Sequence, residues 1–382
     1  MKRMILFGGS FNPVHIGHLW MAQAAREVLS AQTVVFMPTG DSPHKKVHTA
    51  AAHRARMVQL ACAPVPGFVF SGLEVQKDGP SYTIQTVKHL LKEDPERKIT
   101  LLIGEDSLLQ FHTWKSYEEL LSLVTLAVVP RFHAIDADTG AQMQRLFDRG
   151  AKIHGIPMPR IELSSTQIRK RARLGRTLSH LVPRDVANYI EEQKLYRDER
   201  TDAVLERLQR TLSLARYQHS LRVAETAERL AEIHGVDPEQ ALVAGLLHDS
   251  AKGREEELLS DETVRDNFNE EKEARSLWHT YLGPGVAAGE YGVDDQAVLD
   301  AIRRHTTADL EMTRLDKILY IADKTEPGRS DPENPGLLRL AERDLDEAFF
   351  RVMEASVHYL KANGLQVHPV TNKIYQNLSK ER

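Results

Sequence analysis

The first candidate for chemistry near the start of the chain is the string GGSFNPVHIGH, residues 8–18. It stands between an apolar run, Met4–Phe7, and an amphipathic stretch, Leu19–Leu29, and so predicts a strand, a glycine turn and a helix. Glycine amides can approach a phosphate closely, and a helix N-terminus adds more amides and the positive end of its dipole. His15 and His18 can both face that phosphate. A lone glycine pair would more often be a plain turn with surface histidines, but the complete string favours a phosphate-binding site.

A second candidate lies in the other half of the chain, where His248–Asp249 ends an apolar stretch. Adjacent histidine and aspartate often arise by chance as a cap or a surface feature. Here further candidate ligands accompany them in a defined order: His219 upstream, His279 and His305 downstream, and Asp323 last. Polar residues at the ends of several apolar helical stripes predict a metal site inside a helical bundle. A buried carboxylate in such a place is costly unless it meets a cation.

The elements that must position the first site alternate between strands and helices. Short apolar runs bounded by glycine or proline, with helical stretches such as Leu19–Leu29 and Ser81–Leu91 between them, predict a doubly wound parallel α/β sheet. Ligands of such sheets bind beyond the carboxyl ends of the strands. The stretch Val69–Val75 alternates more and is expected to be an edge strand. The four core strands are expected at Met4–Phe7, Thr33–Met37, Ile99–Ile103 and Thr125–Val129.

The second site needs a different scaffold, because nearly every segment after Tyr196 has a helical period. Val223, Ala227 and Leu230 form a stripe on a helix that Gly235 closes, and Pro238 starts the next helix. No strand pattern is convincing after residue 200, so an all-α domain is expected. We therefore expect an α/β domain at 1–197, a polar linker at 198–204 and a helical domain at 205–382.

Composition agrees with two domains and excludes some partners. The chain has 382 residues, whereas an ordinary domain has about 100–200. A net charge of −4 gives no reason to expect tight binding of nucleic acid. No apolar run approaches the roughly 20 residues of a membrane span. The single cysteine, Cys62, cannot form an intrachain disulfide, which suits a reducing cytoplasm. The expectation is a cytoplasmic protein without a membrane or nucleic-acid partner; the oligomeric state stays open, a homo-oligomer included.

The first half resembles the HxGH nucleotidyltransferases, specifically the bacterial nicotinate-nucleotide adenylyltransferases, over residues 1–197. Two departures stand out. Ser10 and Asn12 replace the usual threonine and aspartate, and Pro130-Arg131-Phe132 replaces an Arg-Pro-Gly sequence. Besides the first string, the resemblance is carried by Pro43-His44-Lys45, Arg54 to Met57, Ser81 to Thr86, Gly104 to Trp114, Ser164 to Arg169 and Val182 to Tyr196.

This resemblance implies transfer of AMP from ATP to nicotinate mononucleotide, with release of pyrophosphate. The phosphate of the mononucleotide is already a nucleophile, so positioning and charge neutralisation are the main tasks. Mg²⁺ is expected to enter with ATP. The implied catalytic residues are His15, His18, Lys45 and Arg169. The implied substrate-binding residues are Gly8, Gly9, Ser10, Phe11, Thr83, Thr86, Gly104, Asp106, Trp114, Ser164, Ser165 and Thr166.

The second half resembles the HD phosphohydrolases, in particular the bacterial branch that cleaves diadenosine tetraphosphate symmetrically into ADP. The resemblance implies one metal held by His219, His248, Asp249 and Asp323. Asp249 would bridge to a second metal held by His279 and His305, although the surroundings of His279 match only loosely. Iron, manganese and zinc all suit such ligands. Lys252, Lys324 and Arg329 are the implied phosphate contacts.

Other readings stay open for both halves. The first domain could be an HxGH transferase for another phosphorylated acceptor, although Trp114 and Ser81 to Thr86 favour nicotinate mononucleotide. The second could hydrolyse nucleoside monophosphates or cyclic dinucleotides. One half could also be a nucleotide sensor that regulates the other.

Overall fold

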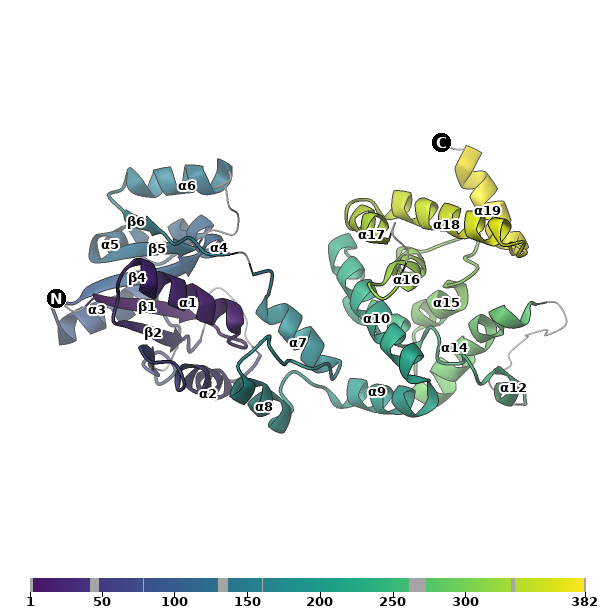
Figure 1. Cartoon of the computed structure of the whole chain (residues 1–382), viewed down its shortest axis with the longest axis horizontal. Coiled ribbons are helices and arrows are strands. Elements are labelled where there is room, and N and C mark those ends of the chain that lie inside the picture. Colours follow the sequence, from purple (N-terminus) through teal and green to yellow (C-terminus); the bar gives the residue numbers. More distant parts are fainter. Residues whose placement is uncertain are drawn as a thin grey trace. The chain divides into compact units, whose positions relative to one another are not determined.

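The chain forms two compact units, Met1–Asp198 and Glu199–Arg382, in a computed structural model (Figure 1). The structure describes residues 3–41, 48–77, 79–129, 137–159, 161–260, 273–330 and 334–380. The stretch expected to link the domains, 198–204, lies mostly in the first turns of a helix, α9 (Glu199–Thr211), whose Thr201 is buried. None of the helices in these ranges is long and apolar enough to cross a membrane.

The first unit is built on a six-stranded sheet in which every pair of neighbouring strands is parallel. The strand order is β3-β2-β1-β4-β5-β6, so the chain reverses direction across the sheet between β1 and β4. This confirms the predicted doubly wound α/β fold, whose ligand crevice lies where the order reverses. The strands are β1 (Arg3–Gly9), β2 (Thr33–Pro38), β3 (Phe68–Phe70), β4 (Lys98–Gly104), β5 (Val124–Val129) and β6 (Lys152–Gly155).

The two edge strands differ from expectation. The strand that pairs with β2 is Phe68–Phe70, so only Val69 and Phe70 of the predicted edge strand Val69–Val75 belong to it, and the chain turns at Gly72. The edge position is confirmed, but the predicted length is wrong. β6 was not predicted, because its four residues, Lys-Ile-His-Gly, contain a single apolar side chain.

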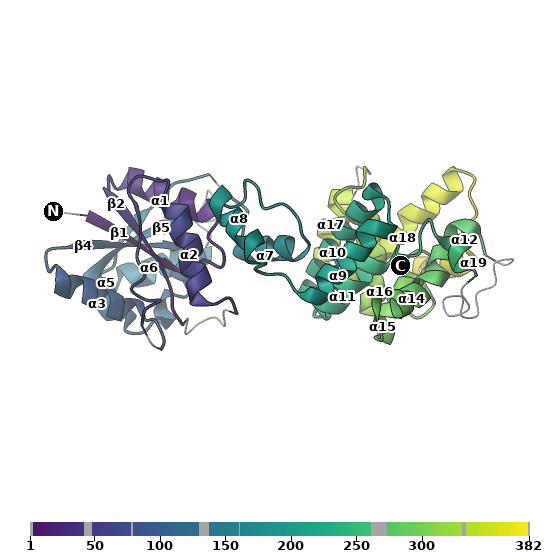
Figure 2. The same cartoon turned by 90° about the horizontal axis from the view of Figure 1, so that it is seen from below.

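Helices cover both faces of this sheet (Figures 1 and 2). Alternate residues of β1 enter two separate cores: Ile5 and Phe7 one, Leu6 the other. The first core receives residues of α1 (Ile16–Val28), α2 (Ala51–Cys62), α7 (Ser165–Arg173) and α8 (Arg184–Glu192). The second receives residues of α3 (Thr83–Glu93), α4 (Glu105–Leu109), α5 (Tyr117–Leu123) and α6 (Ala137–Phe147).

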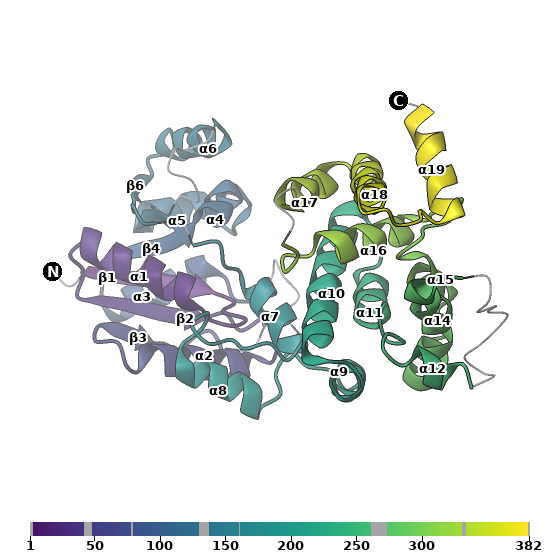
Figure 3. The same ribbon diagram turned by 45° about the vertical axis from the view of Figure 1, so that its right-hand side comes forward.

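Every described element of the second unit is a helix, as predicted (Figure 3). Gly235, with φ of 67°, ends α10 in the left-handed conformation that glycine adopts most readily. Pro238 is the first residue of α11, and Asp237 caps it. The helices after α9 are α10 (Leu214–His234), α11 (Pro238–Leu247), α12 (Glu255–Leu258), α14 (Trp278–Tyr291), α15 (Gln296–Arg304), α16 (Arg314–Thr325), α17 (Asn334–Arg343), α18 (Leu345–Ala362) and α19 (Pro369–Lys380).

One glycine sets the distance between the two helices that bring His219 and His248 together. A Cβ atom on Gly245 of α11 would lie 2.5 Å from the Cα of Ala224 on α10. Any larger residue would push the helices apart, so this contact requires glycine.

Candidate active sites

The predicted phosphate loop follows β1 at the point where the strand order reverses. Gly8 and Gly9 end β1, and Gly104 ends the neighbouring β4, so both glycine positions lie at the carboxyl edge of the sheet. A Cβ atom on Gly8 would meet nothing within 4 Å. The backbone there is open to a ligand. Phe11 of the same loop is a core residue, packed edge-on against Phe7 at 5.3 Å.

His15 and His18 lie against each other at the start of α1, with ring centroids 3.7 Å apart. His15 is 6% exposed, and a Cβ on Gly17, the glycine between the two histidines, would crowd its ring at 3.0 Å. The backbone N–H of His15 donates to Nδ1 of His18 over 3.2 Å. A neutral His18 must therefore carry its proton on Nε2, which makes that nitrogen a hydrogen-bond donor.

Burial controls the charge of these two rings. It lowers the pKa of His15 to about 4. Burial, and next the charge of His15, hold the pKa of His18 well below its ordinary 6.5. Both imidazoles are neutral at neutral pH in this structure, so they offer N–H donors rather than positive charge to a phosphate.

Helix α7 brings the predicted Ser164 to Arg169 motif to the same loop. Ser165 donates through Oγ to the carbonyl of Pro13 over 2.9 Å, and Arg169 donates to the carbonyl of Asn12 over 2.8 Å. Ser164 caps α7, and the hydroxyl of Thr166 accepts from Arg169 over 3.0 Å. The structure thus joins residues more than 150 positions apart in the sequence to one loop.

Arg54 of α2 fixes the backbone of this loop through hydrogen bonds, a role that sequence reasoning missed. It is 2% exposed and donates to the carbonyls of Ser10 and Gly40 over 2.9 and 2.8 Å. Tyr196 donates to the side chain of Asn12 over 2.9 Å. An arginine among the buried positions of α2, beside Met57, was the available signal.

The remaining predicted transferase residues lie elsewhere on the carboxyl edge. Thr83 starts α3, Trp114 follows η1 (Phe111–Thr113) with its ring 5.0 Å from that of Phe111, and Asp106 is exposed on α4. The hydroxyl of Thr86 is buried and donates to Glu74 over 2.6 Å, so a structural partner already engages it. Lys45, with Pro43, His44, Pro130, Arg131 and Phe132, lies outside the described residues.

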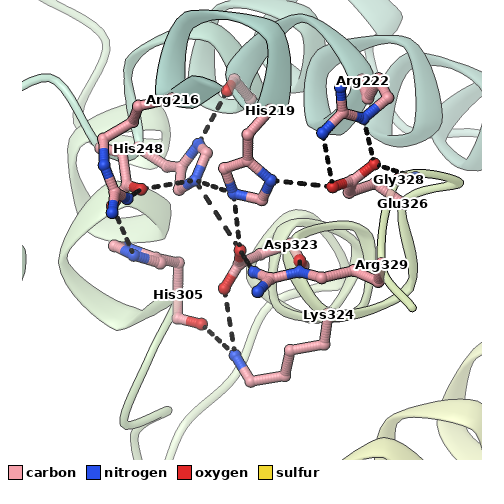
Figure 4. A network of polar contacts seen from close by, with 12 residues as sticks. Arg216, His219, Arg222, His248, His305, Asp323, Lys324, Glu326, Gly328 and Arg329 are labelled. Atoms are coloured by element: carbon pink, nitrogen blue, oxygen red, sulfur yellow. Dashed lines mark hydrogen bonds and ion pairs between the residues drawn. The ribbon is translucent and has the colours of Figure 1, made fainter. Parts of the chain in front are cut away.

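The six predicted ligands of the second site lie in or directly after five helices (Figure 4 labels His219, His248, His305 and Asp323). Each occupies a helix end or a core-facing position, and their side chains are buried or nearly so. His219 lies on α10, His248 and Asp249 directly after α11, His279 at the start of α14, His305 directly after α15 and Asp323 near the end of α16.

Asp249 is common to two ligand groups. His219, His248 and Asp249 form one, and Asp249, His279 and His305 form the other, each with ligand atoms within 4.8 Å of one another. This is the arrangement expected of a carboxylate that bridges two metals. Asp323 lies 3.1 Å from Nε2 of His219, beside the first group.

Two of the histidines are oriented as metal ligands usually are. His248 donates through Nδ1 to the carbonyl of Gly245 over 2.8 Å, and His305 donates in the same way to Ile302 over 2.6 Å. Each Nε2 therefore keeps a lone pair directed at the cluster, which fits a divalent metal ion. His279 differs. The ammonium of Lys252, which can only donate, lies 2.9 Å from its Nδ1. His279 has the position of a ligand without the same hydrogen bonding.

The charges of the cluster also suit a cation. Burial would raise the pKa of Asp249, but His248, His305 and His279 outweigh it and hold the pKa well below its usual range. Burial first, and then neighbouring histidines, lower the pKa of His305 to about 4 and that of His279 to about 2. Ionised carboxylate and neutral imidazole are the states that bind a metal.

Basic side chains lie beside the ligands, among them the three residues predicted as phosphate contacts, Lys252, Lys324 and Arg329. Lys324 and Arg329 reach Asp323 over 3.4 and 2.7 Å, and Lys252 contacts His279. Arg216, which forms an ion pair with Asp249, was not predicted as a site residue, although it stands one turn before His219 on α10.

Two family models match separate parts of the chain. Residues 6–171 match the family model described as cytidylyltransferase-like, and residues 216–328 match that of the HD domain. The fold and these matches define a nucleotidyltransferase unit followed by a helical HD domain, a type of domain that binds divalent metal.

Individual relatives identify the family of the first unit more closely than the family model does. A Symbiobacterium thermophilum protein named probable nicotinate-nucleotide adenylyltransferase is 39% identical over 202 residues, 51% of this chain and 96% of that protein. The chain belongs to the nicotinate-nucleotide adenylyltransferase family, with the HD domain added. A Mycoplasma genitalium protein named probable nicotinate-nucleotide adenylyltransferase/Ap4A hydrolase is 28% identical over 100% of this chain and 99% of its own length. A Clostridium acetobutylicum structure described as a predicted HD superfamily hydrolase involved in NAD metabolism is 33% identical, covers 47% of this chain and has a TM-score of 0.42.

Proposed function

We propose that the chain is a bifunctional enzyme. Residues 1–197 join nicotinate mononucleotide to the AMP part of ATP, giving nicotinate adenine dinucleotide and pyrophosphate, and residues 205–382 hydrolyse diadenosine tetraphosphate to two ADP. The observation that carries the proposal is the presence of both sites in one chain, one built on the open loop at Gly8 and the other on the shared carboxylate of Asp249. Full-length relatives named for both activities support the pairing.

In the transferase, an oxygen of the mononucleotide phosphate attacks the α-phosphorus of ATP, and the bond to the bridging oxygen of pyrophosphate breaks. No base is needed, because the attacking phosphate is already ionised. The Nε2–H of His18 and the N-terminal amides of α1 would donate hydrogen bonds to the phosphates. Arg169, and Lys45 of the neighbouring motif, supply the positive charge that neutral histidines cannot. Mg²⁺ would enter with ATP and share the charge of the leaving pyrophosphate.

The choice of acceptor substrate would depend on residues at the carboxyl edge of the sheet outside the phosphate loop. We assign recognition of the pyridine ring to Trp114, and recognition of its carboxylate to Thr83 and the N-terminal amides of α3. The hydroxyl of Thr86 donates to Glu74, so we assign Thr86 a structural role that holds α3 in position. These donors suit a carboxylate better than a carboxamide, so kcat/KM should be higher for nicotinate mononucleotide than for nicotinamide mononucleotide. Equal values would contradict this assignment.

In the hydrolase, His219, His248, Asp249 and Asp323 would hold one divalent ion, and Asp249, His279 and His305 a second. Iron, manganese and zinc all accept such ligands. The bound ions would supply Lewis acidity to the phosphoanhydride and an activated water at neutral pH. The phosphates of the substrate and of the departing ADP would be bound by basic residues beside the ligands: Lys252, Lys324, Arg329 and Arg216. A bridge from Lys252 to phosphate would also release Nδ1 of His279.

We place this enzyme in the cytoplasm, where its single, buried cysteine, Cys62, would stay reduced. Its partners would be the small molecules ATP, nicotinate mononucleotide and diadenosine tetraphosphate, and no nucleic acid.

The decisive experiment incubates the purified chain with ATP and nicotinate mononucleotide, and separately with diadenosine tetraphosphate and added metal. Products are identified by chromatography and mass. The dinucleotide with pyrophosphate, and ADP alone, are expected. AMP plus ATP from the second reaction would refute symmetric cleavage. Turnover of other nucleotides but not of these substrates would favour a different transferase or hydrolase, and no turnover in one half would favour a sensor.

A further inference from the structure

The ring of His219 is held at both of its nitrogen atoms (Figure 4). Its Nε2 lies 3.1 Å from Oδ1 of Asp323 and 3.3 Å from Nε2 of His248, on the side of the ligand cluster. Its Nδ1 lies 3.0 Å from Oε1 of Glu326, on the opposite side. Asp323 and Glu326 therefore hold one imidazole from a single helix end, that of α16.

His219 needs such a partner because of its place in the fold. His248 and His305 follow the ends of α11 and α15, and their Nδ1 atoms donate to carbonyls of the last turn. Carbonyls of a last turn lack intrahelical partners and are available. His219 lies inside α10 (Leu214–His234), where the carbonyls of the preceding turn accept helix hydrogen bonds. An acceptor for its Nδ1–H must come from another element, and Glu326 provides it.

Glu326 is itself fixed on its other sides. It is 1% exposed, and Arg222, one turn after His219 on α10, donates to both of its oxygens over 2.5 and 3.1 Å. The backbone N–H of Gly328 donates to Oε2. A Cβ on Gly328 would lie 2.3 Å from Nε of Arg222, so any other residue here would displace the guanidinium from this position. A carboxylate with so many donors has little freedom to turn.

We propose that Glu326 is a positioning residue for the metal site and that Arg222 locks it in place. The Glu326 carboxylate keeps the proton of His219 on Nδ1, so that the Nε2 lone pair points at the metal. The inference rests on the proposed metal site, and it assigns to Glu326 and Arg222 the role that carboxylates behind ligating histidines have in metalloproteins.

The test measures metal binding as well as activity. Metal-free full-length chain is titrated with Mn²⁺ by calorimetry, for the wild type and for Glu326→Gln. Loss of such a partner should weaken binding about 10- to 100-fold. With Mn²⁺ in excess, kcat for diadenosine tetraphosphate should fall while KM changes little, because Glu326 does not face the phosphates. Glu326→Asp, which keeps the charge but is shorter, should also weaken binding.

The matched control is Glu290→Gln in the same unit. Glu290 also accepts two hydrogen bonds from one arginine, Arg254, over 2.9 and 3.2 Å, but contacts no proposed ligand. Its Mn²⁺ affinity should equal that of the wild type, even if its Tm falls as far as that of Glu326→Gln. If Glu326→Gln does not fold, Arg222→Gln serves instead, with a smaller loss expected. Wild-type affinity in the folded Glu326 or Arg222 variants would overturn the inference alone. A wild-type chain that binds no Mn²⁺ would overturn the metal site with it.

Discussion

The histidines of the transferase site show how one residue type serves two kinds of chemistry in this chain. His15 and His18 stack on each other and stay neutral through burial, and the nitrogen of His18 that faces away from its own backbone partner is a donor. His248 and His305 instead direct an acceptor, the lone pair of Nε2, toward their site. In both sites a backbone hydrogen bond at the other ring nitrogen selects the tautomer.

Removal of the His18 donor should slow the transferase without loss of fold. We expect His18→Ala to lower kcat for dinucleotide synthesis by about 10²-fold or more, as with other transition-state donors. Pyrophosphate release measures the rate, and circular dichroism checks the fold. His89→Ala, which removes an exposed histidine of α3, should keep the wild-type rate. Near-normal turnover in His18→Ala would show that this histidine is not part of the machinery.

Buried His15 should make the first unit less stable in acid. Its pKa is about 4 when folded, against 6.5 for the free side chain, so the unfolded chain takes up a proton that the folded chain excludes. The free energy of unfolding should fall as the pH falls from 6.5 toward 4, with a contribution of up to about 1.4 kcal/mol per pH unit. His15→Gln should remove this contribution.

Urea unfolding at several pH values measures this contribution of His15 to the free energy of unfolding. In a Trp278→Phe background, fluorescence reports only Trp20 and Trp114, both of the first unit. Identical pH slopes with and without His15 would contradict the prediction.

At the scale of elements, the contact between α10 and α11 sets the geometry of the hydrolase. Gly245→Ala would place a Cβ atom 2.5 Å from the backbone of Ala224. We expect it to destabilise the second unit by about 1–3 kcal/mol and to weaken Mn²⁺ binding, because His219 and His248 move apart. The control is Gly289→Ala on α14, where a Cβ meets nothing within 4 Å; there alanine should stabilise by up to about 1 kcal/mol. Equal Tm values for the two variants would refute the role of the helix contact.

The elements also show what sequence can predict. The strands β1, β2, β4 and β5 were predicted because each is a continuous apolar run, whereas β6 carries one apolar residue and is recognised only from its pairing with β5. Within the sites, His15, His18 and the ordered HD ligands follow from local strings. Arg54 and Glu326 were missed as site residues, since their roles depend on which carbonyl or ring lies opposite them after folding.

At the scale of the whole molecule, two compact units should mean two independent activities. Asp249→Ala removes the carboxylate common to both ligand groups, so it should lose both metals and abolish hydrolysis. Dinucleotide synthesis should stay at the wild-type rate, because Asp249 belongs to the other compact unit. Metal content per chain and both activities are measured on one preparation. Slower synthesis in this variant would show that the two units are coupled.

The division of one chain into two compact units also bears on gene dosage. Whatever the level of expression, each ribosome that completes this chain delivers one transferase unit and one hydrolase unit. Transcription and translation can raise or lower both capacities together but cannot change their ratio. In the cell, that ratio can still change through the occupancy of each site, by substrate in the first unit and by metal in the second. Scarcity of that metal would then lower hydrolysis by the second unit, while dinucleotide synthesis by the first unit of the same molecule would continue.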